Sequence, residues 1–256
     1  MHRIFLALAV VLSSLGSAVA TKPPSAHVVF MIGEDEYHTW ETLPEFAERD
    51  LKPLGYRLTV INADAADKNN FPGLVAALKT ADVLVLSVRR RTPPAEQLNA
   101  VRAHLAAGKP LVGIRTACHA FALRPTDPPA AAPLSTWQGF DPEVLGGHYT
   151  NHHPAGPRAA IVAAARANAH QILSGISFAQ FSTPGSLYKV SPLENDTTVL
   201  LTGSIPGEPS EPVAWTRLYG PKRARVFYTS LGHPDDFKTT EFRRLLVDGI
   251  AWALGK

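Results

Sequence analysis

The fold of this chain follows from residues 111–121, which read LVGIRTACHAF. A short apolar run stops abruptly at Arg115 and continues with threonine, cysteine and histidine. This pattern is typical of a buried parallel strand that delivers polar groups at its carboxyl end. In open α/β sheets, ligands bind outside the carboxyl ends of the strands, near the point where strand order reverses. We therefore expect the functional site at the end of this strand.

Two earlier apolar runs are predicted to reach the same edge of the sheet. Residues 26–33 run into an acidic and aromatic loop at 34–38, and residues 81–88 run into three consecutive arginines at 89–91. Because the carboxyl ends of neighbouring parallel strands meet at one edge, the three polar segments should face one crevice. We place the function in that crevice.

The rest of the chain alternates between strand and helix patterns. Residues 27–114 read β-α-β-α-β-α-β, which predicts a parallel sheet with helices on both faces. Thr39 and Thr92 are expected to cap the first and third helices, and Thr239 or Thr240 the last one. Apolar runs at 187–190, 198–202, 213–218 and 225–230 predict further strands, and a hairpin at 217–222 makes part of the sheet antiparallel.

Length and composition restrict the class of protein. The chain has 256 residues, of which 45% are hydrophobic and 18% charged, a balance typical of one ordinary globular domain. The formal net charge is +3, and the basic residues are scattered apart from 89–91. Nucleic-acid binding needs a longer basic stripe with interleaved aromatic residues, so we expect no nucleic-acid partner.

Residues 1–20 have the pattern of an export signal. A short basic start precedes an apolar run at 4–12 that is too short to span a bilayer, and small residues at 17–20 predict cleavage after Ala20. No later stretch is apolar enough to cross a membrane. We expect residues 21–256 to form one exported domain, periplasmic or secreted, with no membrane contact after cleavage. A homo-oligomer is an open alternative to a monomer.

Cys118 is the only cysteine, so no disulfide can form within the chain. The adjacent His119 suggests a thiol nucleophile, but adjacency in sequence does not bring two side chains into a hydrogen-bonded pair. Free cysteine is more often a buried, unreactive residue. We therefore expect substrate binding from His119 and leave the role of Cys118 open.

Three histidines, His148, His152 and His153, fall within six residues. Neutral imidazole is a common metal ligand, so this cluster is a candidate site for a divalent metal such as zinc. The spacing matches no tight metal motif, and a loop of surface histidines is the alternative. No cofactor is otherwise indicated.

His233 follows a predicted strand and precedes Pro234, Asp235 and Asp236. A histidine at the end of a strand can act as a general acid or base, held in one tautomer by a neighbouring carboxylate. His-Pro-Asp-Asp is also good turn chemistry. We expect a catalytic role for His233 with Asp235.

Charged residues at the predicted crevice offer two further roles. The arginines there can bind a carboxylate, a phosphate or an oxyanion, because guanidinium presents fixed paired donors; they are Arg89, Arg90, Arg91 and Arg115. Alternatively, these arginines neutralise the acidic loop after the first strand. Glu34 and His38 in that loop are candidate substrate-binding residues, although acidic side chains are also favoured at a helix start.

Five segments in order along the chain carry a family resemblance: VGIRTA (112–117), LGGHYTNH (145–152), PVAWTR (212–217), VFYTSLGH (226–233) and FRRLLVDGIAW (242–252). In these segments the chain resembles the ThuA-like (trehalose utilisation) family. The resemblance implies a class I glutamine amidotransferase-like fold, a flavodoxin-like three-layer α/β sandwich. It also implies a role in carbohydrate use, notably of disaccharides processed through keto-sugar intermediates.

The chain departs from the glutamine amidotransferase pattern at residues 113–117, between the strand and the helix expected to follow it. In glutamine amidotransferases the strand-to-helix elbow carries a cysteine, and Arg115 stands about where that cysteine would be. His233 with Pro234 and Asp235 resembles their His-Pro-Glu sequence. A base-like histidine without the nucleophile argues against glutaminase activity. The family itself often has histidine where this chain has Arg115.

Our leading hypothesis is a hydrolase or lyase that acts on keto-glycosides, with a small-molecule carbohydrate as its partner. His233 or His152 is the candidate base, and Arg115, Arg89 or a bound metal stabilises the enolate. The alternative is a non-catalytic sugar- or anion-binding module. A third hypothesis is a hydrolase that depends on Cys118.

Overall fold

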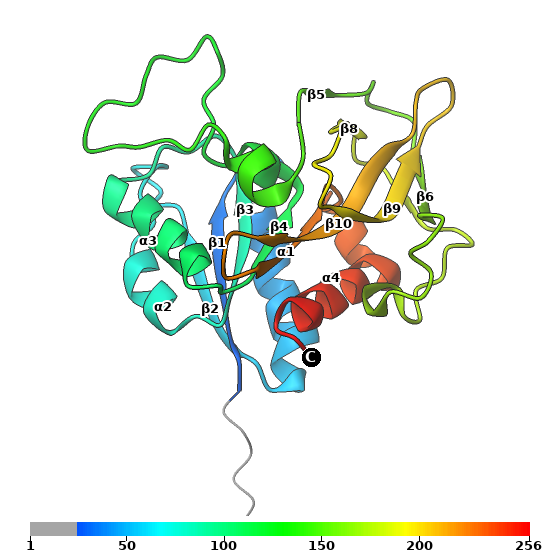
Figure 1. The fold of residues 1–256 in the computed structure, drawn as a ribbon, viewed down its shortest axis with the longest axis horizontal. Helices are drawn as coiled ribbons and strands as arrows, with labels where there is room; N and C mark the ends of the chain where they lie inside the picture. Colours follow the sequence, from blue (N-terminus) through cyan, green and yellow to red (C-terminus); the bar gives the residue numbers. More distant parts are fainter. Residues whose placement is uncertain (1–24) are drawn as a thin grey trace, which may run out of the picture.

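The computed structural model describes residues 25–256, so the predicted export signal lies outside the described residues. A nine-stranded sheet with the order β2-β1-β3-β4-β11-β10-β9-β6-β7 forms its centre (Figure 1). β2, β1, β3, β4 and β11 run parallel, and β10, β9, β6 and β7 continue the sheet in antiparallel pairs. The strands span His27–Gly33 (β1), Arg57–Asn62 (β2), Val83–Val88 (β3), Leu111–Ile114 (β4), Ala159–Ala163 (β6), Ser182–Thr183 (β7), Thr198–Ser204 (β9), Glu211–Tyr219 (β10) and Ala224–Thr229 (β11). The predicted α/β class with antiparallel C-terminal strands is confirmed.

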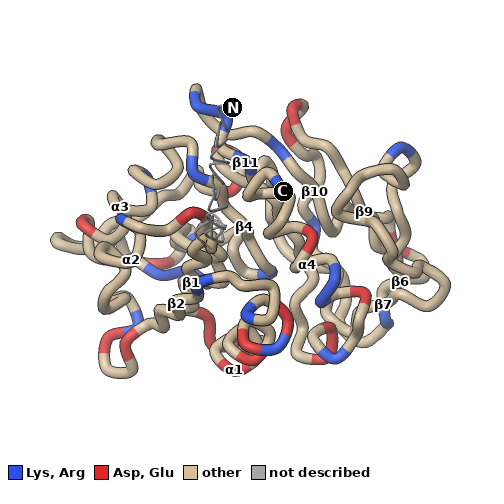
Figure 2. Tube along the Cα trace, turned by 90° about the horizontal axis from the view of Figure 1, so that it is seen from below, with Lys and Arg blue, Asp and Glu red and all other residues tan. Residues whose placement is uncertain are grey.

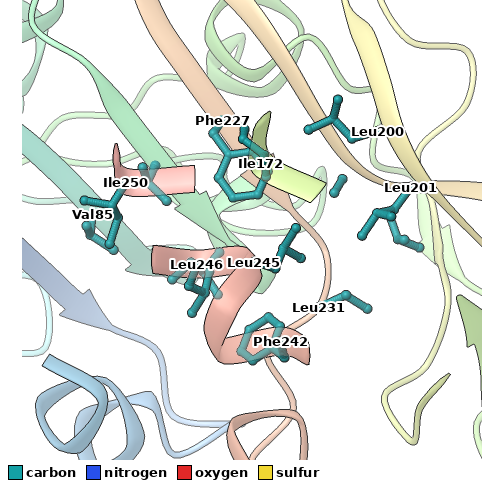
Figure 3. Close-up of a cluster of buried hydrophobic side chains, with 14 of the residues drawn as sticks. Val85, Ile172, Leu200, Leu201, Phe227, Leu231, Phe242, Leu245, Leu246 and Ile250 are labelled. Atoms are coloured by element: carbon teal, nitrogen blue, oxygen red, sulfur yellow. The ribbon is translucent and has the colours of Figure 1, made fainter. Parts of the chain in front are cut away.

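Helices cover both faces of the sheet. One apolar cluster joins α1 (Thr39–Phe46) and α4 (Thr240–Ala253) to one face, and a second joins α2 (Leu74–Thr80) and α3 (Ala95–Ala106) to the other. Along β1, Val28 and Phe30 belong to the first cluster, and Val29 and Met31 to the second, because successive side chains point to opposite faces. Figure 3 shows the α4 side chains of the first cluster lying beside Phe227 of β11. Because helices cover both faces, the ends of the strands are the part of the sheet that a ligand can reach.

The carboxyl ends of β1, β3 and β4 are neighbours, as predicted. β1 lies between β2 and β3, so strand order reverses beside it, which is where open α/β sheets bind ligands. The backbone N–H of Arg89 donates to the carbonyl of Gly33 over 3.1 Å, and Thr39 Oγ1 lies 2.9 Å from Ser87 Oγ. The loops after β1 and β3 are therefore tied together at this edge.

A small second sheet lies outside this edge. β5 (Asn151–His152) pairs antiparallel with β8 (Tyr188–Lys189), with His152 opposite Tyr188. This pairing brings the histidine-rich segment against a segment some forty residues further along the chain.

Two predicted helix starts are wrong. α1 begins at Thr39 with His38 as its N-cap, and the Thr39 hydroxyl donates to Glu34 instead of capping the helix. α3 begins at Ala95 after Pro94, and the backbone N–H of Thr92 is held by Asn69. Pro93 and Pro94 have no N–H for Thr92 to cap, and the backbone N–H of Ala95 donates to the carbonyl of Pro133. The cap at Thr239 is confirmed, since its hydroxyl accepts from the backbone N–H of Phe242.

Charges of both signs are interspersed along the described chain. Blue and red segments alternate in the view from below (Figure 2). Among residues 25–256, none of the helices has the length and apolar character that crossing a membrane requires.

Two buried carboxylates fix the loops that form the edge. Glu34 is 2% exposed, and its oxygens accept from the backbone N–H groups of Glu36, Tyr37 and Thr39. Asp236 is 1% exposed, and its Oδ2 accepts from the backbone N–H groups of Gly232 and His233 and from the Thr183 hydroxyl. Burial raises the pKa of Asp236 above its ordinary value, although these donors oppose the rise. Each carboxylate thus sets the path of one loop at the sheet edge.

Asp236→Ala should destabilise the fold by about 2 kcal/mol, because it leaves buried donors without an acceptor. The adjacent Asp235 is the matched control: its side chain is 47% exposed and pairs with Lys238. Asp235→Ala should change the unfolding free energy by no more than about 0.5 kcal/mol. Urea unfolding followed by circular dichroism measures both. Equal effects of the two substitutions would contradict the role given to Asp236.

Candidate functional site

A cleft of about 410 Å³ opens at the carboxyl edge of the sheet. The loop after β1 supplies Tyr37, the loop after β3 supplies Arg89, and the turn after β4 supplies His119. The small second sheet closes the cleft with His152 and Tyr188. The three strand ends predicted to share a crevice therefore do so.

Arg115 lies beneath this cleft, and no part of it is available to a ligand. It is 1% exposed, and Nη1 donates to the carbonyls of Ser186 (3.1 Å) and Ser230 (2.7 Å). Nη2 donates to Tyr37 Oη (3.2 Å) and Ser186 Oγ (3.1 Å). The guanidinium carbon also lies 4.4 Å and 4.2 Å from the ring centres of Tyr37 and Tyr188. Arg115, predicted to be catalytic, is therefore a positioning residue that holds Tyr37, Ser186 and Ser230 in place.

The chain changes direction sharply at Arg115. Its φ of 49° lies in the left-handed region, as at a sharp strand-to-helix elbow, and β4 passes there into a 3-10 turn, Arg115–His119. Burial opposes the charge of the guanidinium, but Tyr188 and Tyr37 raise its pKa above the ordinary value. Arg115 therefore remains a cation enclosed by aromatic rings and carbonyl oxygens.

The cations that do line the cleft come from two other loops. Arg89 pairs with Glu36 over 2.8 Å, and Arg90 donates to the carbonyl of Ala122. Arg124 completes the group. Burial lowers the pKa of Arg90, and the nearby Arg124 and Arg89 lower it further. Arginines thus outnumber carboxylates on the cleft wall, which favours bound or developing negative charge.

Arg91 points away from the cleft. Its Nε donates to the carbonyl of Gly33 over 2.9 Å, and its Nη2 pairs with Asp35. The alternative considered for the arginines, neutralisation of the acidic loop, therefore describes Arg91, while Arg89 both pairs with Glu36 and borders the cleft.

An aromatic wall forms one side of the cleft. The His119 ring stacks on Tyr149 with 4.5 Å between centroids, and Tyr149 lies 4.7 Å from Tyr188. Burial lowers the pKa of His119 well below its ordinary value, and the surrounding arginines act in the same direction. His119 is therefore neutral and suited to packing or hydrogen bonding against a ligand.

Tyr149 is held in place by a buried carboxylate. Asp141 Oδ2 accepts from the Tyr149 backbone N–H over 2.7 Å, and burial raises the pKa of Asp141 to about 7. Sequence reasoning missed Asp141, Tyr149 and Tyr188. Only Tyr149 had a signal, its position inside the histidine-rich segment.

His152 lies on the cleft in the tautomer that a general base needs. Its Nδ1 is 2.8 Å from the carbonyl of His153, and a carbonyl oxygen can only accept, so Nδ1 carries the proton. The neutral ring therefore has its lone pair on Nε2. The side chain is exposed, so solvent or a ligand can reach that atom.

His233 is held in the opposite tautomer. Its Nδ1 accepts from the backbone N–H of Asp235 over 3.2 Å, so a neutral ring carries its proton on Nε2. The Asp235 carboxylate is 3.8 Å from Nδ1, beyond hydrogen-bond distance, and is engaged by Lys238. His233 does not line the cleft. The centre of its ring lies 6.4 Å from the ring centre of Tyr37, which does line it. The Nε2–H of His233 can donate a hydrogen bond, but this nitrogen offers no lone pair with which to act as a base.

The three histidines of the candidate metal site diverge. His148 Nδ1 lies 2.7 Å from the carbonyl of Pro192, while His153 is 3% exposed and bonds to Glu208 over 2.9 Å. Among residues 25–256 no group of three or more histidine, cysteine or acidic side chains is arranged to hold a metal ion. The donor set does not fit the predicted zinc site, so we derive no chemistry through a metal.

Three predicted or candidate site residues, Cys118, Glu34 and His38, lie outside the cleft. Cys118 is 3% exposed, its Sγ is 3.1 Å from His119 Nδ1, and burial raises the pKa of its thiol well above the ordinary value. Glu34 is the buried carboxylate that accepts from the backbone of its own loop. His38 faces away from the cleft and stacks on Trp40 with 4.7 Å between ring centres.

Comparison with known proteins agrees with this architecture. A ThuA-like protein from Bacteroides uniformis has a similar structure, with a TM-score of 0.65 at 20% identity over 93% of this chain and 94% of that chain. A ThuA-like protein from Parabacteroides merdae gives a TM-score of 0.62 at 17% identity over 91% of each chain. At these identities the likeness concerns the fold. Comparison with curated proteins gave no match.

The family follows from a match over most of the chain. A family model described as ThuA, trehalose utilisation, covers residues 46–253. This range contains the turn after β4, the histidine-rich segment and the β11–α4 loop, and it begins after the acidic loop. The family description associates the protein with carbohydrate metabolism and confirms the resemblance read from the sequence. This chain belongs to the ThuA (trehalose utilisation) family.

Proposed function

We propose that this protein cleaves keto-glycosides, as a lyase or hydrolase, by acid–base chemistry in the cleft. The observation that carries the proposal is His152, a histidine on the cleft wall whose hydrogen bond to a backbone carbonyl leaves Nε2 unprotonated. Cationic side chains share the same cleft. A base next to a site for negative charge is the combination that enolate chemistry requires.

The reaction starts with removal of the proton on the carbon next to the ketone. His152 Nε2 takes this proton, and the C–H electron pair forms the enolate, whose charge rests on the former ketone oxygen. Arg89 and Arg90 supply the positive charge that stabilises this oxygen. The enolate then expels the glycosidic oxygen from the neighbouring carbon, and that oxygen takes a proton. Addition of water to the unsaturated sugar would complete a hydrolysis.

The remaining residues hold this arrangement. Arg115 donates to Tyr37 Oη, and Tyr37 lies on the cleft and donates to Glu36 over 3.3 Å. Tyr149 and Tyr188 supply apolar surface for a sugar ring. The His152 imidazolium, which holds the proton taken in the first step, is our candidate for returning a proton to the leaving oxygen, and this returns the base to its neutral form. We further propose that the protein acts after export, given the signal pattern at residues 1–20.

A non-catalytic sugar- or anion-binding module is the second candidate. The observation that favours it is the group of three arginines on the cleft wall against the single carboxylate of Glu36. Such a module would show saturable binding without turnover, whereas the enzyme produces free reducing sugar or an unsaturated product.

Mature protein should release product from keto-disaccharides and none from the parent disaccharides. His152→Ala should lower kcat by about 100-fold or more, since general bases contribute factors of that order. His148→Ala is the matched control: it removes a histidine of the same segment whose ring bonds to Pro192 outside the cleft. Chromatographic product analysis of both variants measures the effect. Saturable binding of the keto-sugar with no turnover would select the binding module.

Cys118→Ala should retain kcat within about two-fold, because the thiol is buried, has a raised pKa and lies off the cleft. In the native protein, an aromatic disulfide reagent should label this thiol far more slowly than in urea. A loss of turnover comparable to that of His152→Ala, in a variant with native circular dichroism, would instead establish the thiol-dependent hydrolase.

A further inference from the structure

A second cavity lies on the other side of β1 from the cleft. It has a volume of about 310 Å³ and is lined by the end of β1, the end of β2 and the first turn of α1. Its side chains include Trp40, Asp35, Asn62 and Lys68. The cleft uses the residues between β1 and β3, so the two hollows share the β1–α1 loop but not their lining residues.

The β1–α1 loop is built to present side chains to both hollows. His38 has a φ of 52° and a ψ of 32°, a left-handed conformation that is uncommon for a residue other than glycine. The buried Glu34 carboxylate holds this turn by accepting from three backbone N–H groups and the Thr39 hydroxyl. As a result Tyr37 borders the cleft and Trp40 borders the second cavity. Backbone strain of this kind collects at ligand sites.

Trp40 is a large apolar side chain left at the surface. Its exposure is 37%, whereas Trp215 is fully buried and Trp137 is 6% exposed. The His38 ring packs on it at an interplanar angle of 31° and supports the indole from one side. An indole held at the mouth of a cavity supplies an apolar platform at little entropic cost.

The rest of the cavity wall is polar. Asp35 pairs with Lys68 over 3.6 Å and with Arg91. Burial opposes the charge of Asp35, but Arg91 and Lys68 lower its pKa overall, so it is ionised near neutral pH. Asn62, at the end of β2, adds an exposed amide. A carboxylate, an ammonium and an amide around an indole provide donors and acceptors together.

This combination fits one class of ligand. A pyranose ring has an apolar face of C–H groups and an edge of hydroxyls, each both donor and acceptor. A simple anion would meet the Asp35 carboxylate, and a purely apolar ligand would leave the charged rim without partners. The volume of the cavity is at the lower end of ligand pockets and suits a single ring.

We propose that the cavity beside Trp40 is a second sugar-binding site, which takes one pyranose ring with its C–H face on the indole and its hydroxyls on Asp35, Asn62 and Lys68. This site extends the proposed carbohydrate function, but binding here needs neither the cleft nor turnover. The ring belongs to a free monosaccharide or to one half of a disaccharide, which the experiment distinguishes.

Quenching of tryptophan fluorescence by acrylamide tests this site directly. The probes are methyl α-D-glucopyranoside and trehalose, with glycerol as the control for hydroxyl concentration. Both sugars should protect the exposed tryptophan from acrylamide in a saturable way, and Trp40→Phe should abolish the protected signal. Trp252→Phe is the matched control, since Trp252 is a partly exposed indole at the far end of α4. Equal affinities would assign the site to any free pyranose, and a tenfold preference for trehalose would assign it to a disaccharide.

Two rim variants and one cleft variant complete the test. Asn62→Ala and Lys68→Ala should each weaken binding about tenfold, the loss expected for a hydrogen bond to the ligand. His152→Ala should leave it unchanged, so failure of the keto-glycoside reaction and failure of this site give different results. Three results would overturn the proposal: no saturable protection by either sugar, protection unchanged in Trp40→Phe, or protection by adenosine but not by the sugars.

Discussion

The cleft depends on a buried cation that has no carboxylate partner within residues 25–256. Arg115 donates to Tyr37, Ser186 and Ser230, which belong to three segments distant in sequence, and its guanidinium lies against the rings of Tyr37 and Tyr188. Placing a guanidinium out of water is costly unless its donors are satisfied. Both Nη groups are satisfied here, whereas Nε has no hydrogen-bond partner among the described residues. The bonds of the Nη groups form only when the three segments keep the observed backbone path.

The chemistry we propose follows from backbone contacts more than from residue type. His152 lies in β5 of the small sheet, and His233 lies in the loop after β11. A carbonyl acceptor fixes the proton of His152 on Nδ1, whereas a backbone N–H fixes that of His233 on Nε2. On Nε2, the His152 ring is thereby prepared to accept a proton, and the His233 ring to donate a hydrogen bond.

The sequence predicted the edge of the sheet well because strand ends are local features. The apolar runs before Glu34, Arg89 and Arg115 identified three neighbouring strands, and their ends do meet. Side-chain direction was less predictable. Arg115 lies beneath the cleft because its guanidinium bonds to Tyr37, Ser186 and Ser230. The pairing of β5 with β8, a non-local contact, brings Tyr188 to the wall, where His152 alone of the three histidines lines the cleft. The caps predicted at Thr39 and Thr92 failed for a related reason, since Glu34 takes the Thr39 hydroxyl and Pro133 takes the N–H of Ala95 that Thr92 would cap.

Hydrogen–deuterium exchange of Arg115→Lys most directly tests the claim that this cation organises the cleft. Lysine keeps the charge but cannot bond to Tyr37, Ser186 and Ser230 in the planar arrangement of guanidinium. The account predicts faster exchange in the loop at 34–38, the segment at 185–188 and the turn at 230–233 together, with β2, α2 and α3 unchanged. Unchanged exchange in those three segments, or a uniform increase over the whole chain, would contradict it.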